Sequence, residues 1–330
     1  MQKKHPANCI LGALCISFLI GCSAGDVPSA AKPSDAASAK PSSQTKVEEN
    51  TNLTPVRDTT PFCPMPEASG TATCGNDVTT IDSSHTQDGY IMVNYTGTCP
   101  KVKLIITGPN DYKCTYDIQG NEFSAFPLTS GNGSYSVGVY ENIQGTQYST
   151  CYTTVIEAND IGEFAPYLRP NQYCYYEETY DTVALAKDIC QYSETDLDLV
   201  TCVYDYITQN ITYDQDKAVA ASSGSLTGYI SDIDASLADK KGICLDYAAM
   251  MTCMLRTQQI PTRLEVGYAG STYHAWISVY LDDIGWVNGI IEFTGSDWSL
   301  MDPTFGASTG SKELREFIGD GTNYTTKYIY

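Results

Sequence analysis

The stretch at residues 240–260 constrains the fold of this chain more than any other segment. Gly242 precedes a run in which apolar residues recur at spacings of three and four from Ala248 to Leu255. This spacing predicts a helix that begins near Cys244 and buries one face. We expect Gly242 to let the chain approach closely and to leave the sulfur open. Unpaired backbone N–H groups and the helix dipole favour negative charge in a first turn, so the pattern predicts a lowered pKa and a nucleophilic thiolate for Cys244.

A general base for this thiol is easy to search for, because the chain has only three histidines, His5, His85 and His274. His5 lies in a segment that we expect to be removed, and His85 lies in a polar stretch typical of a loop. His274 lies in an alternating aromatic and β-branched run that predicts a strand. A strand packed against the start of the helix could present this imidazole to the sulfur. Asp302, where the next strand is expected to stop, is the candidate that orients the ring.

These residues carry a resemblance to a known family. Gly-Ile-Cys244-Leu-Asp-Tyr-Ala, Tyr-His274-Ala-Trp and Met-Asp302-Pro-Thr resemble three blocks of the transglutaminase-like superfamily of papain-like cysteine enzymes. Residues 210–214 resemble the short block before the cysteine in bacterial members, and residues 256–263 keep all but the glycine of the usual linker. The resemblance covers residues 174–330. It implies a Cys–His–Asp triad in which Cys244 attacks an amide carbonyl, His274 moves protons and Asp302 holds the ring.

Each of these residues also has a simpler structural explanation. A single cysteine on a helix is usually a small buried hydrophobe, as we expect for Cys253 on the same helix. A histidine in a strand is commonly structural, and an aspartate before proline commonly forms a turn. The order and spacing of four blocks, with one histidine in this half of the chain, favour the triad over three unrelated residues.

The N-terminus resembles the leader of a bacterial lipoprotein. Two lysines precede an apolar run at residues 9–20, which is too short to span a bilayer and suits a signal-peptide core. The run ends in Leu19-Ile20-Gly21-Cys22, which resembles a lipobox. We expect residues 1–21 to be a signal peptide and lipid on Cys22 to anchor the protein to the outer side of the cell membrane. An ordinary secretory signal is the alternative.

Residues 22–61 are expected to be a disordered tether, because large apolar residues are almost absent from them. Such a tether would let the folded part reach into the wall layer.

Residues 62–160 predict a small immunoglobulin-like β-sandwich. Short β-rich runs are separated by Gly, Asn, Asp and Pro at the spacing of a sandwich. The runs lie at residues 90–95, 101–107, 112–116, 133–140 and 147–155. No catalytic constellation is evident here, so we expect a spacer or a module that binds wall or substrate.

Residues 170–330 predict an α+β domain that carries the transglutaminase-like motifs. Helical patterns with acidic starts occur at 181–190 and 196–207. A loop at 216–237, rich in Ala, Ser and Gly, is expected to border the cleft. Beyond the helix at Cys244, strands of an antiparallel sheet are expected at residues 263–268, 273–280 and 285–293.

The amino-acid composition narrows the classes of partner that this chain could bind. The formal net charge is −20, with 39 acidic against 19 basic residues, which argues against nucleic acid. This charge suits solubility outside the cell or a cationic partner. There is no Cys-x-x-Cys, no histidine cluster and no complete calcium loop, so we expect no metal and no cofactor.

The chain has thirteen cysteines, and counting them does not determine which of them form disulfides. Cys9 and Cys15 would leave with the signal, Cys22 would carry lipid and Cys244 must stay free, which leaves an odd number. Some of the rest could pair outside the cell. The candidates are Cys63 with Cys74, and the strand cysteines Cys99, Cys114 and Cys151.

The mechanism that follows is a hypothesis. The Cys244 thiolate attacks an amide of a protein or peptide substrate, and the Cys244 backbone N–H helps to hold the oxyanion. Tyr213 or Tyr229 is a candidate second donor or supporting residue. His274 protonates the leaving amine, and an amine or water resolves the thioester. Two other classes remain: an idle transglutaminase-like domain in a binding or wall-architecture lipoprotein, and a solute- or carbohydrate-binding lipoprotein in which the sandwich does the work.

Overall fold

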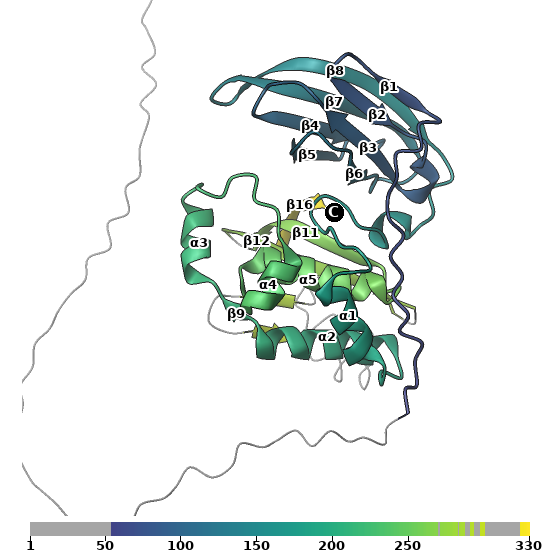
Figure 1. The fold of residues 1–330 in the computed structure, drawn as a ribbon, viewed down its shortest axis with the longest axis vertical. Helices are drawn as coiled ribbons and strands as arrows, with labels where there is room; N and C mark the ends of the chain where they lie inside the picture. The colour runs from purple at the N-terminus through teal and green to yellow at the C-terminus, as the bar shows by residue number, and fades with distance from the viewer. Residues whose placement is uncertain (1–53, 270, 283, 288–290, 294–297, 301–323) are drawn as a thin grey trace, which may run out of the picture. The chain divides into compact units, whose positions relative to one another are not determined.

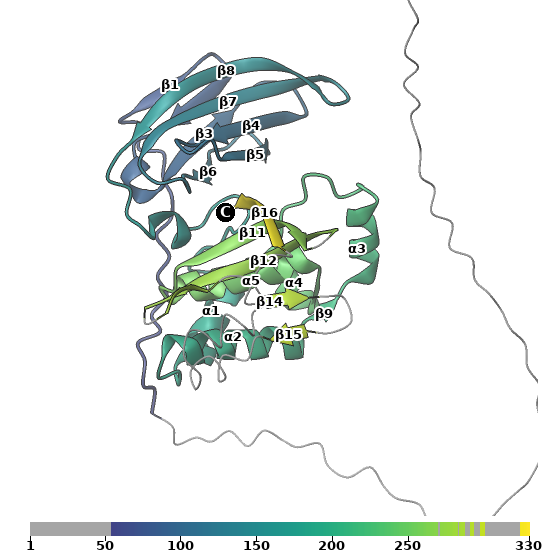
Figure 2. The same cartoon turned by 180° about the vertical axis from the view of Figure 1, so that it is seen from behind.

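The computed structural model describes residues 54–330 apart from 270, 283, 288–290, 294–297 and 301–323 (Figure 1). Its N-terminal part contains two four-stranded antiparallel sheets (Figure 2). The first sheet has the order β1-β2-β3-β6, and the second has the order β5-β4-β7-β8. The strands are β1 (Thr73–Gly75), β2 (Thr79–Asp82), β3 (Tyr90–Tyr95), β4 (Val102–Thr107), β5 (Lys113–Ile118), β6 (Ser124–Pro127), β7 (Gly133–Gln144) and β8 (Gln147–Ala158). All five strands expected in this region are confirmed.

The alternation of buried and half-buried residues explains why these segments form strands of a sheet with one face in the core. In β4, Val102, Leu104 and Ile106 are buried while the residues between them are half-buried, so one face of the strand points into the core. Short 3-10 turns at Thr86–Asp88 and Ala165–Tyr167 connect the strands to one another and to the next part of the chain.

The C-terminal part combines helices with a mixed set of strands. Its main sheet is antiparallel with the order β13-β12-β11-β16, β14 pairs with β15, and β9 pairs in parallel with β10. The helices are α1 (Asp181–Cys190), α2 (Asp196–Asn210), α3 (Gln215–Ser222), α4 (Ile233–Asp239) and α5 (Cys244–Thr257). The strands are β9 (Thr212–Tyr213), β10 (Lys241–Gly242), β11 (Thr262–Ala269), β12 (Thr272–Leu281), β13 (Gly285–Val287), β14 (Ile291–Phe293), β15 (Trp298–Leu300) and β16 (Tyr324–Ile329).

Helix α5 is the centre of this part, and its environment corrects one expectation. It packs against α1, α2 and α4 on one side and against β11 and β12 on the other (Figures 1 and 2). Every residue from Asp246 to Thr257 is therefore buried. The prediction that α5 buries only one face was wrong, because two layers enclose it. Its start at Cys244 was predicted correctly.

Two other expectations needed correction. The segment at 216–237 is not one loop: it contains α3 and most of α4. Each helix has an aspartate N-cap, since Asp214 accepts from the Lys217 amide and Asp232 from the Ala235 amide, both at 2.9 Å. The expected strand at 285–293 is instead two short strands, β13 and β14, which belong to different sheets.

The segment before the first sheet is also docked rather than free. The amide of Val56 donates to the Gln191 carbonyl at 3.0 Å, and the amide of Phe62 donates to the Thr257 carbonyl at 2.8 Å. Between them Thr59 is buried. The expectation of a disordered tether up to residue 61 was therefore wrong for residues 56–61, which bind the ends of α1 and α5.

The two sheets of the N-terminal part share a core with the C-terminal part. Buried apolar side chains form one connected cluster that reaches from Ile81 to Tyr330. Polar contacts cross the same boundary, since Gln119 donates to the Gly228 carbonyl at 2.7 Å and Gln172 donates to the Asp117 carbonyl at 2.6 Å. The N-terminal sheets are thus built into the wall of the C-terminal part and are not a detached spacer.

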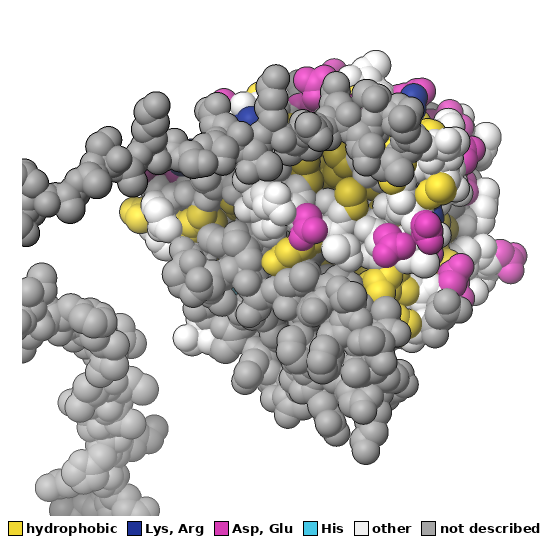
Figure 3. All heavy atoms as spheres, turned by 90° about the horizontal axis from the view of Figure 1, so that it is seen from below, with side chains coloured by type: hydrophobic (Ala, Val, Ile, Leu, Met, Phe, Trp, Pro, Cys, Tyr) yellow, Lys and Arg dark blue, Asp and Glu magenta, His cyan; other side chains and the backbone are white. Residues whose placement is uncertain are grey.

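All ten cysteines among the described residues are free thiols. The pairs considered for Cys63, Cys74, Cys99, Cys114 and Cys151 are therefore not formed in this structure. None of the helices described is both long enough and apolar enough to cross a bilayer. Acidic side chains stand out on the face shown in Figure 3, in keeping with the net charge of −20.

Arg256, at the end of α5, joins distant segments although its side chain is completely buried. Its guanidinium donates to the Thr262 carbonyl at 2.8 and 3.0 Å, to the Arg169 carbonyl at 2.6 Å and to the Tyr330 backbone oxygen at 2.8 Å. This fork geometry suits several acceptors at once.

Replacing Arg256 by methionine is expected to lower the free energy of unfolding by about 3 kcal/mol or more, because the backbone oxygens of Thr262, Arg169 and Tyr330 each lose a donor. Urea unfolding followed by tryptophan fluorescence measures this. Arg57→Met is the matched control: Arg57 pairs with Asp196 in a partly exposed ion pair, so about 1 kcal/mol or less is expected. Equal losses in both variants would contradict the role given to Arg256.

Candidate active site

Cys244 is the first residue of α5, directly after β10. β10 pairs in parallel with β9, which places Gly242 opposite Tyr213. The structure requires a glycine at position 242 for a different reason from the one expected. A Cβ at this position would lie 2.7 Å from the Cβ of Asp246, so the glycine makes room for that carboxylate and not for the sulfur.

Asp246 is the residue that sequence reasoning missed. Its side chain is fully buried, and it accepts from the Ile243 amide at 2.8 Å, from Ser231 at 2.7 Å and from Tyr229 at 2.6 Å. The ammonium of Lys217 lies 2.7 Å from its second oxygen and also donates to Tyr229. One carboxylate therefore ties α3 and residues 229–231 to the start of the cysteine helix. An aspartate at the third helical position is a capping signal that could have indicated the local bond.

The electrostatics at Cys244 overturn the predicted thiolate. Burial raises the pKa of the Cys244 thiol, and the Asp246 carboxylate adds to the rise. Hydrogen bonds from the Ala275, Leu245 and Cys244 amides lower it, but they do not outweigh burial. The start of a helix alone therefore does not ionise this thiol, and a neighbouring base must accept its proton.

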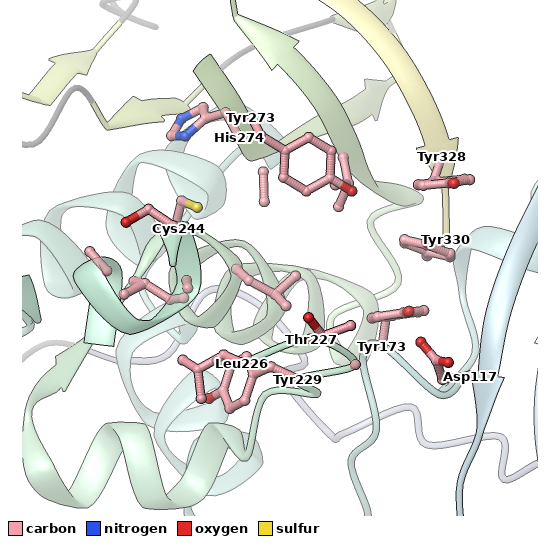
Figure 4. A pocket seen from close by; sticks show the side chains of 18 of the residues that line it. Asp117, Tyr173, Leu226, Thr227, Tyr229, Cys244, Tyr273, His274, Tyr328 and Tyr330 are labelled. Carbon is pink, nitrogen blue, oxygen red and sulfur yellow. The ribbon is translucent and has the colours of Figure 1, made fainter. Parts of the chain in front are cut away.

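His274 lies on β12, which packs against α5. It is 8% exposed, and its ring stacks on Trp276 with the ring centroids 6.4 Å apart. Cys244, His274 and Ala275 line the same cavity, which places the sulfur beside the histidine strand. In Figure 4 the sulfur and the imidazole lie at the same end of one pocket. The structure thus brings together the cysteine and histidine that the sequence singled out.

The pocket is a cavity of about 920 Å³, within the range of ligand sites. Residues from α3 and from the segment that follows it line the cavity, so the expectation that this region borders the cleft is confirmed. Lys103, Thr115 and Asp117 of the N-terminal sheets also line it. No local pattern in the chain predicts that contribution.

The other candidate residues have different outcomes. Asp302 lies outside the described residues, as β15 ends just before it. Tyr213 lines the cavity, and burial together with the nearby Cys244 raises its pKa. Tyr229 also lines the cavity, but its hydroxyl donates to Asp246. Tyr229 therefore supports the helix start and does not direct its proton at an oxyanion.

A second constellation occurs around His85, in the N-terminal part. One ring nitrogen of His85 lies 3.0 Å from the Ser69 hydroxyl, and the other lies 3.1 Å from the Asp88 carboxylate. Serine, histidine and aspartate are linked in the same order in a hydrolase triad. The amides of Gly70 and Thr71, which follow the serine, donate to other side chains. They cannot form an oxyanion hole, so we assign no catalytic role to this cluster.

Among the described residues, no three His, Cys, Asp or Glu side chains gather as a possible metal site.

The raised pKa of Cys244 gives a pH test of the role of His274. Burial and Asp246, which raise the pKa of Cys244, both remain in His274→Gln, so alkylation of Cys244 in that variant should reach its half-maximal rate at a pH above the pKa of an ordinary thiol. With His274 present, the half-maximal rate should shift down by at least about one pH unit, because imidazolium stabilises the thiolate. Peptide mapping after iodoacetamide treatment resolves Cys244 from the other thiols. His85→Gln is the matched control, and superimposable profiles for native protein and His274→Gln would contradict this role.

Part of the chain matches the model of a known family. The model described as Transglutaminase-like superfamily matches residues 183–289. Solved structures similar to the chain include a candidate protease from Parabacteroides distasonis (18% identity, TM-score 0.26, 46% of this chain) and a candidate cysteine protease from Cytophaga hutchinsonii (17%, 0.33, 66% of this chain and 77% of that one). The periplasmic domain of TgpA from Pseudomonas aeruginosa is also similar (14%, 0.30, 74% and 98%). The chain spans 36% of the Parabacteroides protein. A search of curated proteins finds no match. Residues 183–289, which include the cysteine helix and the histidine strand, therefore belong to the transglutaminase-like superfamily.

Proposed function

We propose that this protein is a thiol enzyme that transfers acyl groups from amide bonds of protein or peptide substrates. The observation that carries the proposal is the meeting of Cys244 and His274 at one end of a large cavity, on the helix start and the strand that the family motifs specify. Each residue singly has a structural explanation, but a shared cavity gives both access to the same substrate atom.

The reaction proceeds in two halves. His274 takes the proton of the Cys244 thiol, and the sulfur attacks the amide carbonyl. The C–S bond forms, the C–N bond breaks, and the proton passes from His274 to the leaving amine. In the second half an amine or water attacks the thioester carbonyl, and the sulfur leaves and regains a proton. Asp302 is proposed to hold the imidazole in the productive orientation.

The oxyanion is proposed to bind at the start of α5. Cys244 and Leu245 are the first two residues of α5, and their amides both lower the pKa of the thiol. They have no partner within the helix because they belong to its first turn. Donors fixed in this way stabilise charge that develops near the sulfur. Tyr213, beside them on the cavity wall, is the side chain best placed to assist.

The setting of the enzyme is also a proposal. We infer a leader at residues 1–21 and a lipid anchor on Cys22 that holds the protein to the outer side of a bacterial membrane, from the lipobox-like sequence. The N-terminal sheets are proposed to be an immunoglobulin-like sandwich. The chain crosses repeatedly between the β1-β2-β3-β6 and β5-β4-β7-β8 sheets, which supports this architecture.

Product analysis tests the proposal and decides between transamidation and hydrolysis. The native protein is incubated with a mixture of cellular peptides and a fluorescent primary amine, and mass spectrometry follows both amine incorporation and new peptide termini. We expect at least one of the two products. Their complete absence, in a preparation whose Cys244 is alkylated by iodoacetamide, would favour an idle domain.

A further inference from the structure

The cavity beside Cys244 has walls of distinct chemistry, and these walls predict what it accepts. One wall is a row of tyrosines that leads away from His274 toward Asp117 (Figure 4). The row consists of Tyr273, Tyr328, Tyr330 and Tyr173. Tyr173 and Tyr330 stack with centroids 4.1 Å apart, which fixes the far end of the row. Tyr273, next to the histidine, is 53% exposed and offers its ring to a ligand.

The opposite wall is mainly aliphatic. It comes from α3 and the segment after it, which contribute Ala218, Val219, Ala221 and Leu226. Val219 is 66% exposed, as expected of a side chain that borders an open cleft. Two sets of hydrogen bonds hold the C-terminal end of this wall. Tyr229 and Ser231 donate to the buried Asp246, and the Gly228 carbonyl accepts from Gln119, which directly follows β5.

The far end of the cavity comes from β4 and β5 of the N-terminal sheets. Lys103 and Asp117 face each other there at 2.6 Å, so their charges balance. Apart from the reactive pair Cys244 and His274, the other side chains of the described lining are neutral. A chain with a net charge of −20 thus presents a nearly neutral, ring-rich cleft next to its reactive thiol.

We propose that this cleft selects peptides that carry a neutral aromatic or large aliphatic side chain next to the attacked carbonyl, with the N-terminal sheets closing the far end of the binding site. This inference rests on the proposed function and names the substrate class of the same site. Aromatic side chains gain from burial and from offset or edge contacts with tyrosine rings. The tyrosine hydroxyls can meet the amide groups of the peptide backbone.

Other ligands fit these walls less well. A charged side chain would lose its hydration in a cavity whose described ion pair is already satisfied. A sugar would place most of its hydroxyl groups against the aliphatic side chains of α3, where Ser222 is the one polar partner on that helix that the described lining offers, and the unpaired hydroxyls cost free energy. An apolar side chain meets neither cost.

Site-resolved alkylation tests the inference with probes that share one reactive group. The probes are chloroacetamide and the chloroacetyl derivatives of phenylalanine amide, glutamic acid amide, lysine amide and glucosamine. In each case the sulfur of Cys244 bonds to the CH₂ carbon and chloride leaves. We expect the phenylalanine probe to react with Cys244 at least about tenfold faster than the glutamic acid or lysine probe. Fitting one apolar group into a pocket typically changes a rate by about this factor.

Two variants connect this preference to the walls. Tyr273→Ala and Val219→Ser change exposed side chains of opposite walls, and each should reduce the preference for phenylalanine to about threefold or less, because each removes apolar surface from the site. Tyr192→Ala, an exposed tyrosine between α1 and α2 that does not line the cavity, should keep the native preference. Circular dichroism confirms that the variants fold.

The results separate this inference from the proposed function. Equal rates for the three amino-acid probes, with ready reaction of chloroacetamide, would overturn the inference and leave the enzyme proposal standing. A faster reaction with the glucosamine probe than with the phenylalanine probe would overturn it in favour of a sugar ligand. Failure of every probe to reach Cys244 would overturn both.

Discussion

Replacing Cys244 by serine is expected to abolish both amine incorporation and peptide cleavage. The hydroxyl of serine is a far weaker nucleophile than a thiolate, and a serine at the start of α5 would keep the shape of the site. The loss should be on the order of 10⁶-fold, as is typical when the nucleophile of a triad is removed. Substrate binding should persist, because the cavity walls are unchanged. Labelled peptides should therefore still bind the variant in a fluorescence polarisation assay.

Cys202→Ser provides the matched control for this variant. Cys202 lies on α2, away from the cavity, and its thiol donates to the Ile189 carbonyl at 3.0 Å, a bond that a serine hydroxyl can keep. We expect native activity from it. Product formation by Cys244→Ser at more than about one-hundredth of the native rate would exclude Cys244 as the nucleophile.

The local features of the site could be predicted from sequence, because they depend on neighbours along the chain. The spacing of apolar residues after Gly242 predicted the start of α5 correctly, and the alternating residue pattern around His274 predicted β12. Caps are equally local, yet Asp214 and Asp232 were overlooked in a segment whose Ala, Ser and Gly content suggested a loop. Helices as short as α3 and α4 have too few periodic positions to reveal themselves by pattern alone.

The features that were missed depend on contacts between distant segments. The thiol was expected to ionise because a helix start favours negative charge, but the layers around α5 leave Cys244 half-buried, and this burial reverses the direction of the pKa shift. Nothing local to Lys103 or Asp117 indicates that they close a cavity around Cys244, more than a hundred residues away. Likewise, the four donors to Asp246 come from three separate segments.

Replacing Asp246 by alanine is expected to cause the largest loss of stability among single changes near the site. The change leaves the Lys217 ammonium, two hydroxyls and the Ile243 amide without their acceptor in a buried place. Breaking a buried ion pair by removing one partner typically costs about 3–5 kcal/mol. Urea unfolding should show this loss. Alkylation of Cys244 in the folded variant should become faster and lose its preference for the phenylalanine probe, as the aliphatic wall is released from the helix start.

A second substitution separates the charge from the hydrogen bonds. Adding Lys217→Met to Asp246→Ala removes the stranded cation, so the double variant should regain about 1–2 kcal/mol of stability relative to Asp246→Ala, while the probe preference stays lost. Asp232→Asn is the matched control, because asparagine keeps the N-cap of α4 and should change the unfolding free energy by less than about 0.5 kcal/mol. If Asp246→Ala unfolds within about 1 kcal/mol of the native protein, the carboxylate is not what ties the wall to the helix. If stability falls but the probe preference survives, Asp246 supports the fold without shaping the cleft.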